Sequence, residues 1–253
     1  MNAATPTRPK PLPFASQRTP AIIVPVMAGS LTQLQEFAAL ARETQGIDVL
    51  EWRVDAFIAA DPAHAEFEQL RSAYAVLAAT DLPVLVTVRS KAQGGLVAFS
   101  AGDYAALVTR LLDLQPAAID VEVAHIESPE LVKLAKDARV PVVVSDHDWH
   151  GTPMVSAMVA RLEDMAHIGA DVAKIAVTPQ MADETLDLLA ACHAANDTLD
   201  IPVIGIAMGE LGRASRVIGQ DFGSAATFAA LDAASAPGQL SVANMRDVLN
   251  ALS

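Results

Sequence analysis

A lysine in the middle of an apolar run is the first sign of chemistry in this sequence. Lys174 lies in the stretch GADVAKIAV, and lysine is almost never fully buried unless it is paired or serves a purpose. Burial and neighbouring positive charges would lower the pKa of its ammonium group. The neutral amine that results is a nucleophile toward a carbonyl carbon. We therefore expect Lys174 to carry covalent chemistry.

Other polar side chains recur at every second position of short apolar runs. In a strand this spacing puts them on one face, and they stand toward the C-terminal halves of the runs, the end at which parallel barrels build active sites. Four acidic and three basic groups are close to balance, so they could be buried as a paired network, whereas each would be costly if buried alone. The alternative is that they are solvated strand ends at a barrel mouth. Besides Lys174, the set consists of Glu51, Arg53, Asp55, Thr87, Arg89, Asp120, Glu122, Ser145 and His147.

Eight β-branched runs must position these residues, and they alternate with Ala- and Leu-rich segments of helical period. Near-continuous Val and Ile runs between helices are typical of parallel strands buried on both faces. Eight such units in about 230 residues predict an α/β protein, a single-domain (β/α)8 TIM barrel over residues 21–253. Strands are expected to begin near residues 21, 48, 83, 117, 141, 171, 201 and 225, and helices are expected over 31–44, 63–79, 103–114, 128–138, 153–168, 182–196 and 212–219.

The composition argues against several classes of partner and indicates a cellular compartment. The chain has 253 residues with 30 acidic and 17 basic side chains, a net charge of −13, and this negative field argues against nucleic acid and anionic membranes as partners. No apolar run is long enough to span a membrane. Residues 1–20 hold five prolines and no continuous apolar segment, so we expect a flexible tail rather than a secretion signal. The single cysteine, Cys192, cannot form an intramolecular disulfide, which favours a cytoplasmic location.

Seven motifs, in order along the chain, resemble those of the type I 3-dehydroquinate dehydratases. They are EWRVD at 51, TVRSKAQGG at 87, IDVEV at 119, SDHDWHGTP at 145, KIAVTPQ at 174, MGELGRASR at 208 and FGSAATFAALDAASAPGQ at 222. The resemblance runs from about residue 21 to 252 and implies a (β/α)8 barrel, usually a homodimer. It also implies loss of water from 3-dehydroquinate to give 3-dehydroshikimate, with no cofactor and no metal.

The resemblance assigns roles residue by residue. Lys174 matches the family's Schiff-base lysine and His147 its general acid and base, while Asp120 lies in the matching acidic motif of the fourth strand. Substrate contacts fall on Glu51, Arg53, Arg89, Arg216, Ser235 and Gln239, and apolar walls on Met208 and Phe228. One position departs from the pattern. Gln93 stands where the family normally has a glutamate that partners the catalytic histidine, and an amide cannot stabilise an imidazolium by charge.

Three other interpretations remain open at this stage. The first is a Schiff-base aldolase acting on a sugar phosphate, because the loops after strands seven and eight often bind phosphate in this fold. The second is a metal enzyme with Asp120, Glu122 and His147 as ligands. The third is a catalytically silent barrel that serves in binding or assembly. Within the resemblance, a biosynthetic and a quinate-degrading role use the same dehydration.

Overall fold

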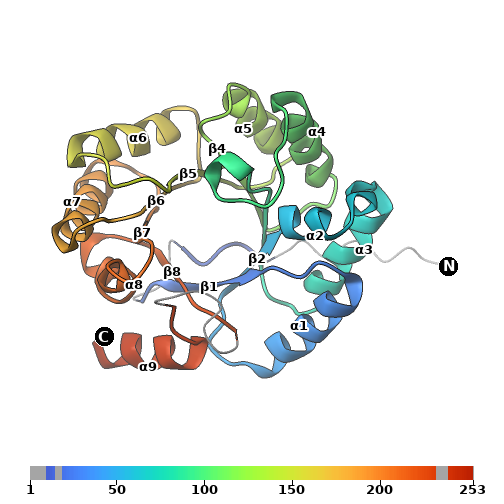
Figure 1. Ribbon diagram of the computed structural model, residues 1–253, viewed down its shortest axis with the longest axis horizontal. Helices are drawn as coiled ribbons and strands as arrows, with labels where there is room; N and C mark the ends of the chain where they lie inside the picture. Colours follow the sequence, from blue (N-terminus) through green and yellow to red (C-terminus); the bar gives the residue numbers. More distant parts are fainter. Residues whose placement is uncertain (1–9, 15–18, 232–238, 253) are drawn as a thin grey trace.

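Eight parallel strands form a nearly closed barrel at the centre of the structure (Figure 1). The computed structural model describes residues 10–14, 19–231 and 239–252. The strands are β1 (Ala21–Val26), β2 (Val49–Arg53), β3 (Val84–Thr87), β4 (Ala118–Glu122), β5 (Val142–Asp148), β6 (Val172–Val177), β7 (Val203–Ala207) and β8 (Ala226–Phe228). They pair in the order β7-β6-β5-β4-β3-β2-β1-β8, and a parallel bridge between Val203 and Ser224 joins the two edges. The predicted single-domain (β/α)8 barrel is confirmed.

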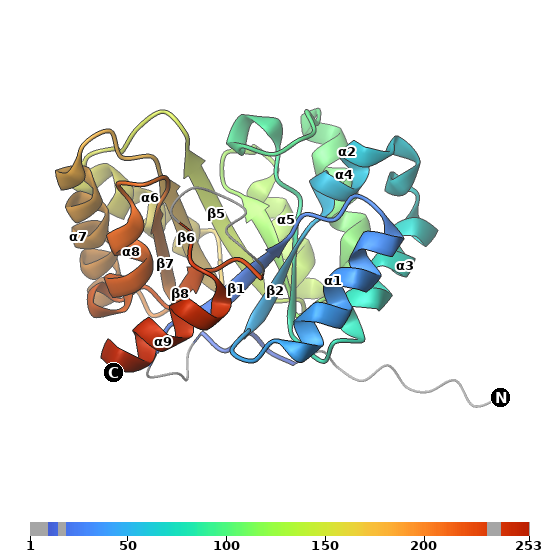
Figure 2. The same cartoon turned by 60° about the horizontal axis from the view of Figure 1, so that its bottom comes forward.

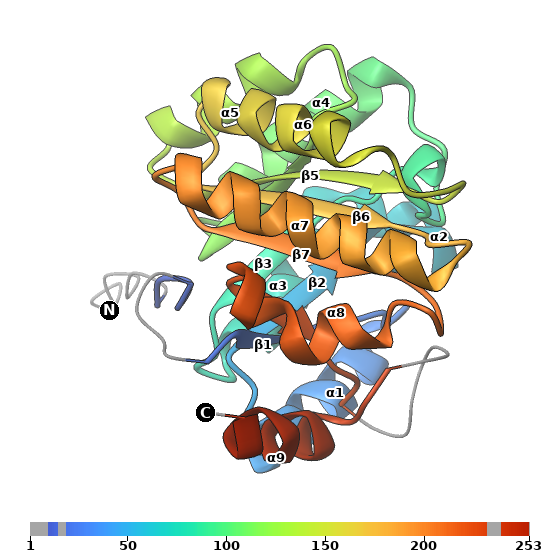
Figure 3. The ribbon, with the colours of Figure 1, turned by 90° about the vertical axis from the view of Figure 1, so that its left-hand side faces the viewer.

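Helices surround the barrel, and all seven expected from the sequence are present (Figures 1 and 2). The helices are α1 (Leu31–Glu43), α2 (Val54–Ala60), α3 (Phe67–Ala78), α4 (Ala101–Leu112), α5 (Ser128–Asp137), α6 (Val155–His167), α7 (Ala182–Thr198), α8 (Arg213–Ile218) and α9 (Val242–Leu252), with short 3₁₀ turns η1 (Pro62–Ala65), η2 (Lys91–Gln93) and η3 (Gly219–Phe222). Figure 3 shows α6 and α7 alongside β5, β6 and β7. Within the described ranges, no helix is both long and apolar enough to cross a bilayer.

Two helices were not expected, and one expected helix is divided. The expected helix over 63–79 begins as η1, where the Asp61 carboxylate caps the N–H of Ala63. The extended backbone of Glu66 then separates η1 from α3. The unexpected α2 begins directly after β2, so Asp55 lies on a helix and not at the end of a strand. The unexpected α9 buries Val242, Met245 and Leu249, a helical spacing that the sequence already contained.

The inward-facing residues change from apolar to polar along the strands. Near the N-terminal ends, Val49, Val143 and Val172 pack together inside the barrel. Two positions further on, the same face of each strand carries a polar group, as at Glu51 on β2 and Lys174 on β6. Period-two alternation therefore fills the floor of the barrel with hydrophobic side chains and brings the polar ones together at the C-terminal end.

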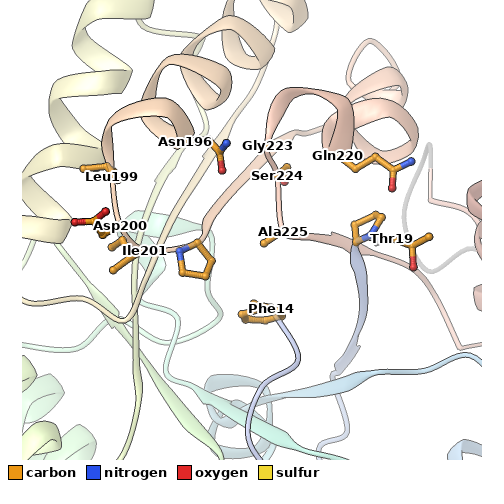
Figure 4. A pocket seen from close by; sticks show the side chains of 12 residues that line it. Phe14, Thr19, Asn196, Leu199, Asp200, Ile201, Gln220, Gly223, Ser224 and Ala225 are labelled. Atoms are coloured by element: carbon orange, nitrogen blue, oxygen red, sulfur yellow. The ribbon is translucent and has the colours of Figure 1, made fainter. Parts of the chain in front are cut away.

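The N-terminal end of the barrel is closed by residues ahead of β1. Leu12 and Phe14 pack against the apolar floor, and Phe14 is only 9% exposed. This short stretch thus differs from the flexible tail expected for residues 1–20, because its apolar side chains cover the barrel floor. Beside it lies a cavity of about 420 Å³, lined by residues that precede β1, β7 and β8 (Figure 4). This cavity is at the opposite end of the strands from the polar cluster.

Candidate active site

A second cavity opens at the C-terminal ends of the strands and gathers most of the residues singled out from the sequence. Its volume is about 170 Å³. Glu51, Arg53, Arg89, Gln93, His147, Lys174, Met208, Arg216, Phe228 and Gln239 line it, together with Pro25, Gly94, Trp149, Ala176 and Ile206. Asp120 is not among the lining residues but forms an ion pair with Arg89, which is. Ser235 lies outside the described residues.

Lys174 projects from the middle of β6 and is 4% exposed. Its Nζ lies 3.6 Å from Oε1 of Glu51 and 4.7 Å from the centroid of the Phe228 ring. Burial lowers the pKa of Lys174, and the positive charges of Arg89 and Arg53 lower it further, against the opposing effect of the nearby carboxylates. The site therefore favours a neutral amine at the wall of the cavity.

Glu51 on β2 is the ionised partner of this lysine. Burial alone would raise the pKa of Glu51, but Lys174, Arg53 and Arg89 together bring it below its ordinary value. The hydroxyl of Thr87 also donates to Oε1 of Glu51 over 3.1 Å. Glu51 therefore stays ionised 3.6 Å from the amine, where its negative charge can orient Lys174 and favour a positive charge on the lysine nitrogen.

Arg89 follows β3 and connects three strands through a buried network. Its guanidinium donates to Oδ1 of Asp120 and to Oε1 of Glu122, each over 2.9 Å, and to the Ser145 hydroxyl over 3.0 Å. Although burial disfavours the charge, Asp120 and Glu122 raise the pKa of Arg89 above its usual value. Of the two alternatives that the sequence left open for these residues, the structure shows the buried network of paired charges at Arg89, Asp120 and Glu122.

Arg53 and Asp55 fix the rim of the cavity on the β2 side. The guanidinium of Arg53 makes two bonds of 2.8 Å to the carboxylate of Asp55. Asp55 is fully buried and also accepts the backbone N–H groups of Arg89 and Leu96. This carboxylate thus ties the loop after β3 to the start of α2, and it leaves Arg53 facing the cavity.

His147 stands near the end of β5 and is oriented by Gln93. The side-chain oxygen of Gln93 accepts the backbone N–H of His147 over 3.0 Å and lies 3.2 Å from ring Nδ1. Burial lowers the pKa of His147 well below its ordinary 6.5, and Arg89, Lys174 and Arg53 lower it further. A neutral imidazole with Nδ1 engaged by Gln93 is suited to act as a base through its other nitrogen.

Two glycines after Gln93 allow close contacts around the histidine. Gly94 has a φ of 84°, and a Cβ there would collide with the indole ring of Trp149. A Cβ on Gly95 would collide with the backbone carbonyl of Arg89. The ring of Trp149 therefore packs directly on the backbone beside Gln93 and contributes to the cavity wall.

Arg216 lies on α8 and is one of the cationic groups that line the cavity. It is 9% exposed, and its Nε has no hydrogen-bond partner in the described part of the chain. Burial lowers the pKa of Arg216. Met208 and Phe228 supply apolar wall, and Gln239 reaches the cavity from the segment that leads into α9. A buried guanidinium with free donor capacity is well placed for a carboxylate.

The sequence motifs did not reveal four side chains that complete the site. Asp146 bonds to Gln93, and Trp149 walls the cavity. Behind the Arg89 network, His125 stacks on Tyr104 with centroids 3.9 Å apart and lies 3.0 Å from Oε2 of Glu122. Asp146 and Trp149 stand within the SDHDWH motif, so proximity to His147 was the available signal. No signal in the sequence connected Tyr104 and His125 with the site.

The metal-enzyme interpretation does not fit this arrangement. Asp120 and Glu122 each accept a hydrogen bond from Arg89 through one oxygen, so each already pairs with a cation of the protein itself. Among the described residues, no group of three or more His, Cys, Asp or Glu side chains has a geometry suited to a metal ion.

Comparisons with known proteins agree with this geometry. A family model described as type I 3-dehydroquinase matches residues 22–253. The 3-dehydroquinate dehydratase of Lactiplantibacillus plantarum is 43% identical over 210 residues, covering 81% of this chain and 82% of that protein. That of Salmonella typhimurium is 38% identical over 244 residues, covering 92% and 93%. Among solved structures, a type I 3-dehydroquinate dehydratase from Clostridium difficile gives a TM-score of 0.87 at 33% identity, covering 93% of each chain. The resemblance seen in the motifs is confirmed.

Proposed function

This chain belongs to the type I 3-dehydroquinase family, and from that premise we propose that it dehydrates 3-dehydroquinate through an imine on Lys174. The product is 3-dehydroshikimate, and the reaction is a step of the shikimate pathway. The placement of Lys174 carries the proposal: a buried amine with a lowered pKa faces a cavity that is also lined by His147 and by Arg216, whose Nε has no hydrogen-bond partner among the described residues.

The first step joins the lysine to the substrate. The neutral amine of Lys174 attacks the C3 ketone, and the carbonyl oxygen leaves as water after it gains one proton from the amine nitrogen and one from solvent. The resulting iminium withdraws electrons from C2, which makes a proton there removable. Glu51, 3.6 Å from the amine, stabilises the positive charge that forms on nitrogen.

The second step eliminates the C1 hydroxyl. His147 takes the C2 proton, the electron pair forms the C1–C2 double bond, and the hydroxyl departs as water with a proton delivered by His147. Water then hydrolyses the iminium, restores the C3 ketone and frees Lys174. One molecule of water is lost overall, because the water released on forming the imine is consumed on its hydrolysis.

The remaining residues of the cavity bind and orient the substrate. Arg216 pairs with the substrate carboxylate, and Gln239 and Ser235 contact the bound ligand from the segment before α9. Arg53 and Glu51 face the ring hydroxyls. Arg89 lines the same cavity and supplies positive charge beside the ligand, while three of its N–H groups bond to Asp120, Glu122 and Ser145. Met208 and Phe228 form the apolar wall.

Mass spectrometry after borohydride treatment tests the substrate and the nucleophile together. Wild-type protein incubated with 3-dehydroquinate should gain one reduced adduct, on the peptide that contains Lys174. Lys174→Ala should gain none, and Lys133→Ala, which removes an exposed lysine of α5, should trap as the wild type does. An undiminished adduct on Lys174→Ala excludes this lysine as the nucleophile.

His147→Ala separates imine formation from elimination. The adduct should still form, while turnover should slow by at least about a hundredfold, the usual scale of general acid–base catalysis. Normal turnover in this variant would remove His147 from the mechanism. The aldolase alternative predicts adducts with phosphorylated aldehydes in place of 3-dehydroquinate, and a silent barrel predicts no turnover of either.

Two further properties come with the family resemblance. We expect a homodimer, which size-exclusion chromatography with light scattering tests, and a cytoplasmic location, which the single buried cysteine supports. The net charge of −13 supports a small-molecule substrate and no nucleic-acid or membrane partner.

A further inference from the structure

Gln93 is bound at both ends of its side-chain amide. The oxygen accepts the backbone N–H of His147 over 3.0 Å and lies 3.2 Å from ring Nδ1. The nitrogen donates to Oδ1 of Asp146 over 2.9 Å. Gln93 is 6% exposed, so water contributes little to its hydrogen bonding. Its orientation is therefore decided by the two residues on β5.

The neighbours of this amide leave one orientation. A backbone N–H can only donate, and an ionised carboxylate can only accept. Turning the amide over would put its nitrogen against the N–H of His147 and its oxygen against the carboxylate of Asp146. Both contacts would then be repulsive, so the N–H of His147 and the carboxylate of Asp146 together fix which end of Gln93 faces the histidine.

Asp146 is in turn held by Arg161 of α6. Its second oxygen, Oδ2, lies 2.8 Å from the Arg161 guanidinium. The Asp146 side chain is 18% exposed and that of Arg161 is 44% exposed, so the pair is at the edge of the site. A continuous chain of hydrogen bonds thus runs from α6 through Asp146 and Gln93 to the imidazole.

We propose that Asp146 is a positioning residue that, through the side-chain amide of Gln93, holds His147 in the tautomer with the proton on Nδ1. An amide oxygen carries no proton, so Nδ1 must supply the one that the bond between them requires. Nε2 is then unprotonated, and no hydrogen bond from the described residues reaches it. The lone pair of the base therefore faces the cavity.

In this arrangement the carboxylate of Asp146 is separated from the His147 imidazole by the side-chain amide of Gln93. An acidic residue at position 93 would touch the imidazole directly, whereas Asp146 acts through a neutral amide. The charged groups that act on His147 in this site are then Arg89, Lys174 and Arg53, with Asp146 and Arg161 paired beyond Gln93. The imidazole stays neutral and oriented, which suits a group that must first accept a proton.

The tautomer is directly measurable by long-range ¹H–¹⁵N correlation NMR of protein labelled at histidine. The His147 signals are identified by their loss in His147→Gln. In wild-type protein we expect a protonated Nδ1 and an unprotonated Nε2. In Asp146→Leu, which leaves the Gln93 nitrogen without its acceptor, we expect Nε2–H or a mixture of tautomers. An Nε2–H signal in the wild type would overturn the inference, as would an Asp146→Leu spectrum identical to that of the wild type.

Kinetics supply a second readout, which rests on the proposed function. Asp146→Leu should lower kcat by about tenfold or more, a part of the usual general-base contribution, while KM stays within about twofold because Asp146 touches no substrate. Asp146→Asn keeps an acceptor for Gln93, since the half-exposed Arg161 can turn to solvent, and should retain most of the activity. The matched control is Asp164→Asn, an exposed residue of α6 whose replacement changes the net charge equally and should have no effect.

A charge exchange tests the same chain of bonds if Asp146→Leu folds poorly. Gln93→Glu alone places two carboxylates against each other and should lose activity. Gln93→Glu combined with Asp146→Asn restores one acceptor facing His147 and one donor facing position 93, so activity and the Nδ1–H tautomer should return. A single Gln93→Glu variant as active as the double variant would overturn the inference. The NMR measurement needs no substrate, so failure of the proposed function shows as absent borohydride trapping, and failure of this inference shows in the tautomer.

Discussion

Removing Arg89 should cause a large loss of stability, because two fully buried carboxylates depend on it. Arg89→Met preserves the length of the side chain but removes its bonds to Asp120, Glu122 and Ser145. Asp120 would retain the Ser145 hydroxyl at 2.7 Å, and its Oδ2 has no hydrogen-bond partner among the described residues. Breaking a buried ion pair from one side costs about 3 to 5 kcal/mol, and we expect a loss of about that size.

Urea denaturation followed by circular dichroism measures this loss as a change in the free energy of unfolding. The matched control is Arg71→Met, since Arg71 pairs with Glu68 on the surface, where the side chains are 63% and 72% exposed. An exposed pair contributes about 0 to 1 kcal/mol. Asp120→Asn added to Arg89→Met should recover part of the loss by removing one unpaired charge. A loss below about 1 kcal/mol for Arg89→Met would refute the idea that this network is an interdependent buried unit.

Three further predictions concern binding, protonation and packing. Arg216→Lys should weaken binding of 3-dehydroquinate by about 1 to 3 kcal/mol, because a point charge replaces a planar fork; an unchanged KM would mean that the carboxylate is held elsewhere. His147 should remain neutral at pH 6.5 in an NMR titration, since burial and then Arg89, Lys174 and Arg53 lower its pKa; a midpoint at or above 6.5 would contradict this. Gly205→Ala should destabilise the protein by about 1 to 3 kcal/mol, because its Cβ would collide with the Cys192 sulfur. Adding Cys192→Ala should restore part of that loss in thermal unfolding, and an equal loss in the double variant would place the strain elsewhere.

The sequence predicted the barrel and the end at which the site forms, because both follow from short-range patterns. Near-continuous β-branched runs mark buried parallel strands. Along β2 the inward-facing residue is Val49 and then Glu51, and along β6 it is Val172 and then Lys174. These apolar-to-polar steps mark the inward face of each strand and the polar end of the barrel. The sequence does not indicate α2, because the alternating pattern of β2 continues to Asp55. In the structure the backbone is already helical at Asp55, and its carboxylate bonds to the loop after β3.

The partners of each polar group were decided by the tertiary structure alone. Arg89 lies 31 and 33 residues from the carboxylates that it binds, and His147 lies 54 residues from Gln93. Contacts between residues so far apart in the sequence depend on strand register and barrel closure, which a local sequence pattern does not contain. The sequence by itself therefore determined which residue types face the cavity, including a lysine among apolar neighbours. Only the folded chain decided that Asp120 and Glu122 share one arginine, that the Nε of Arg216 has no hydrogen-bond partner among the described residues, and that Asp146 bonds to the amide beside His147. Hydrogen bonds are short and directional, so these choices required the strands and helices to be in place.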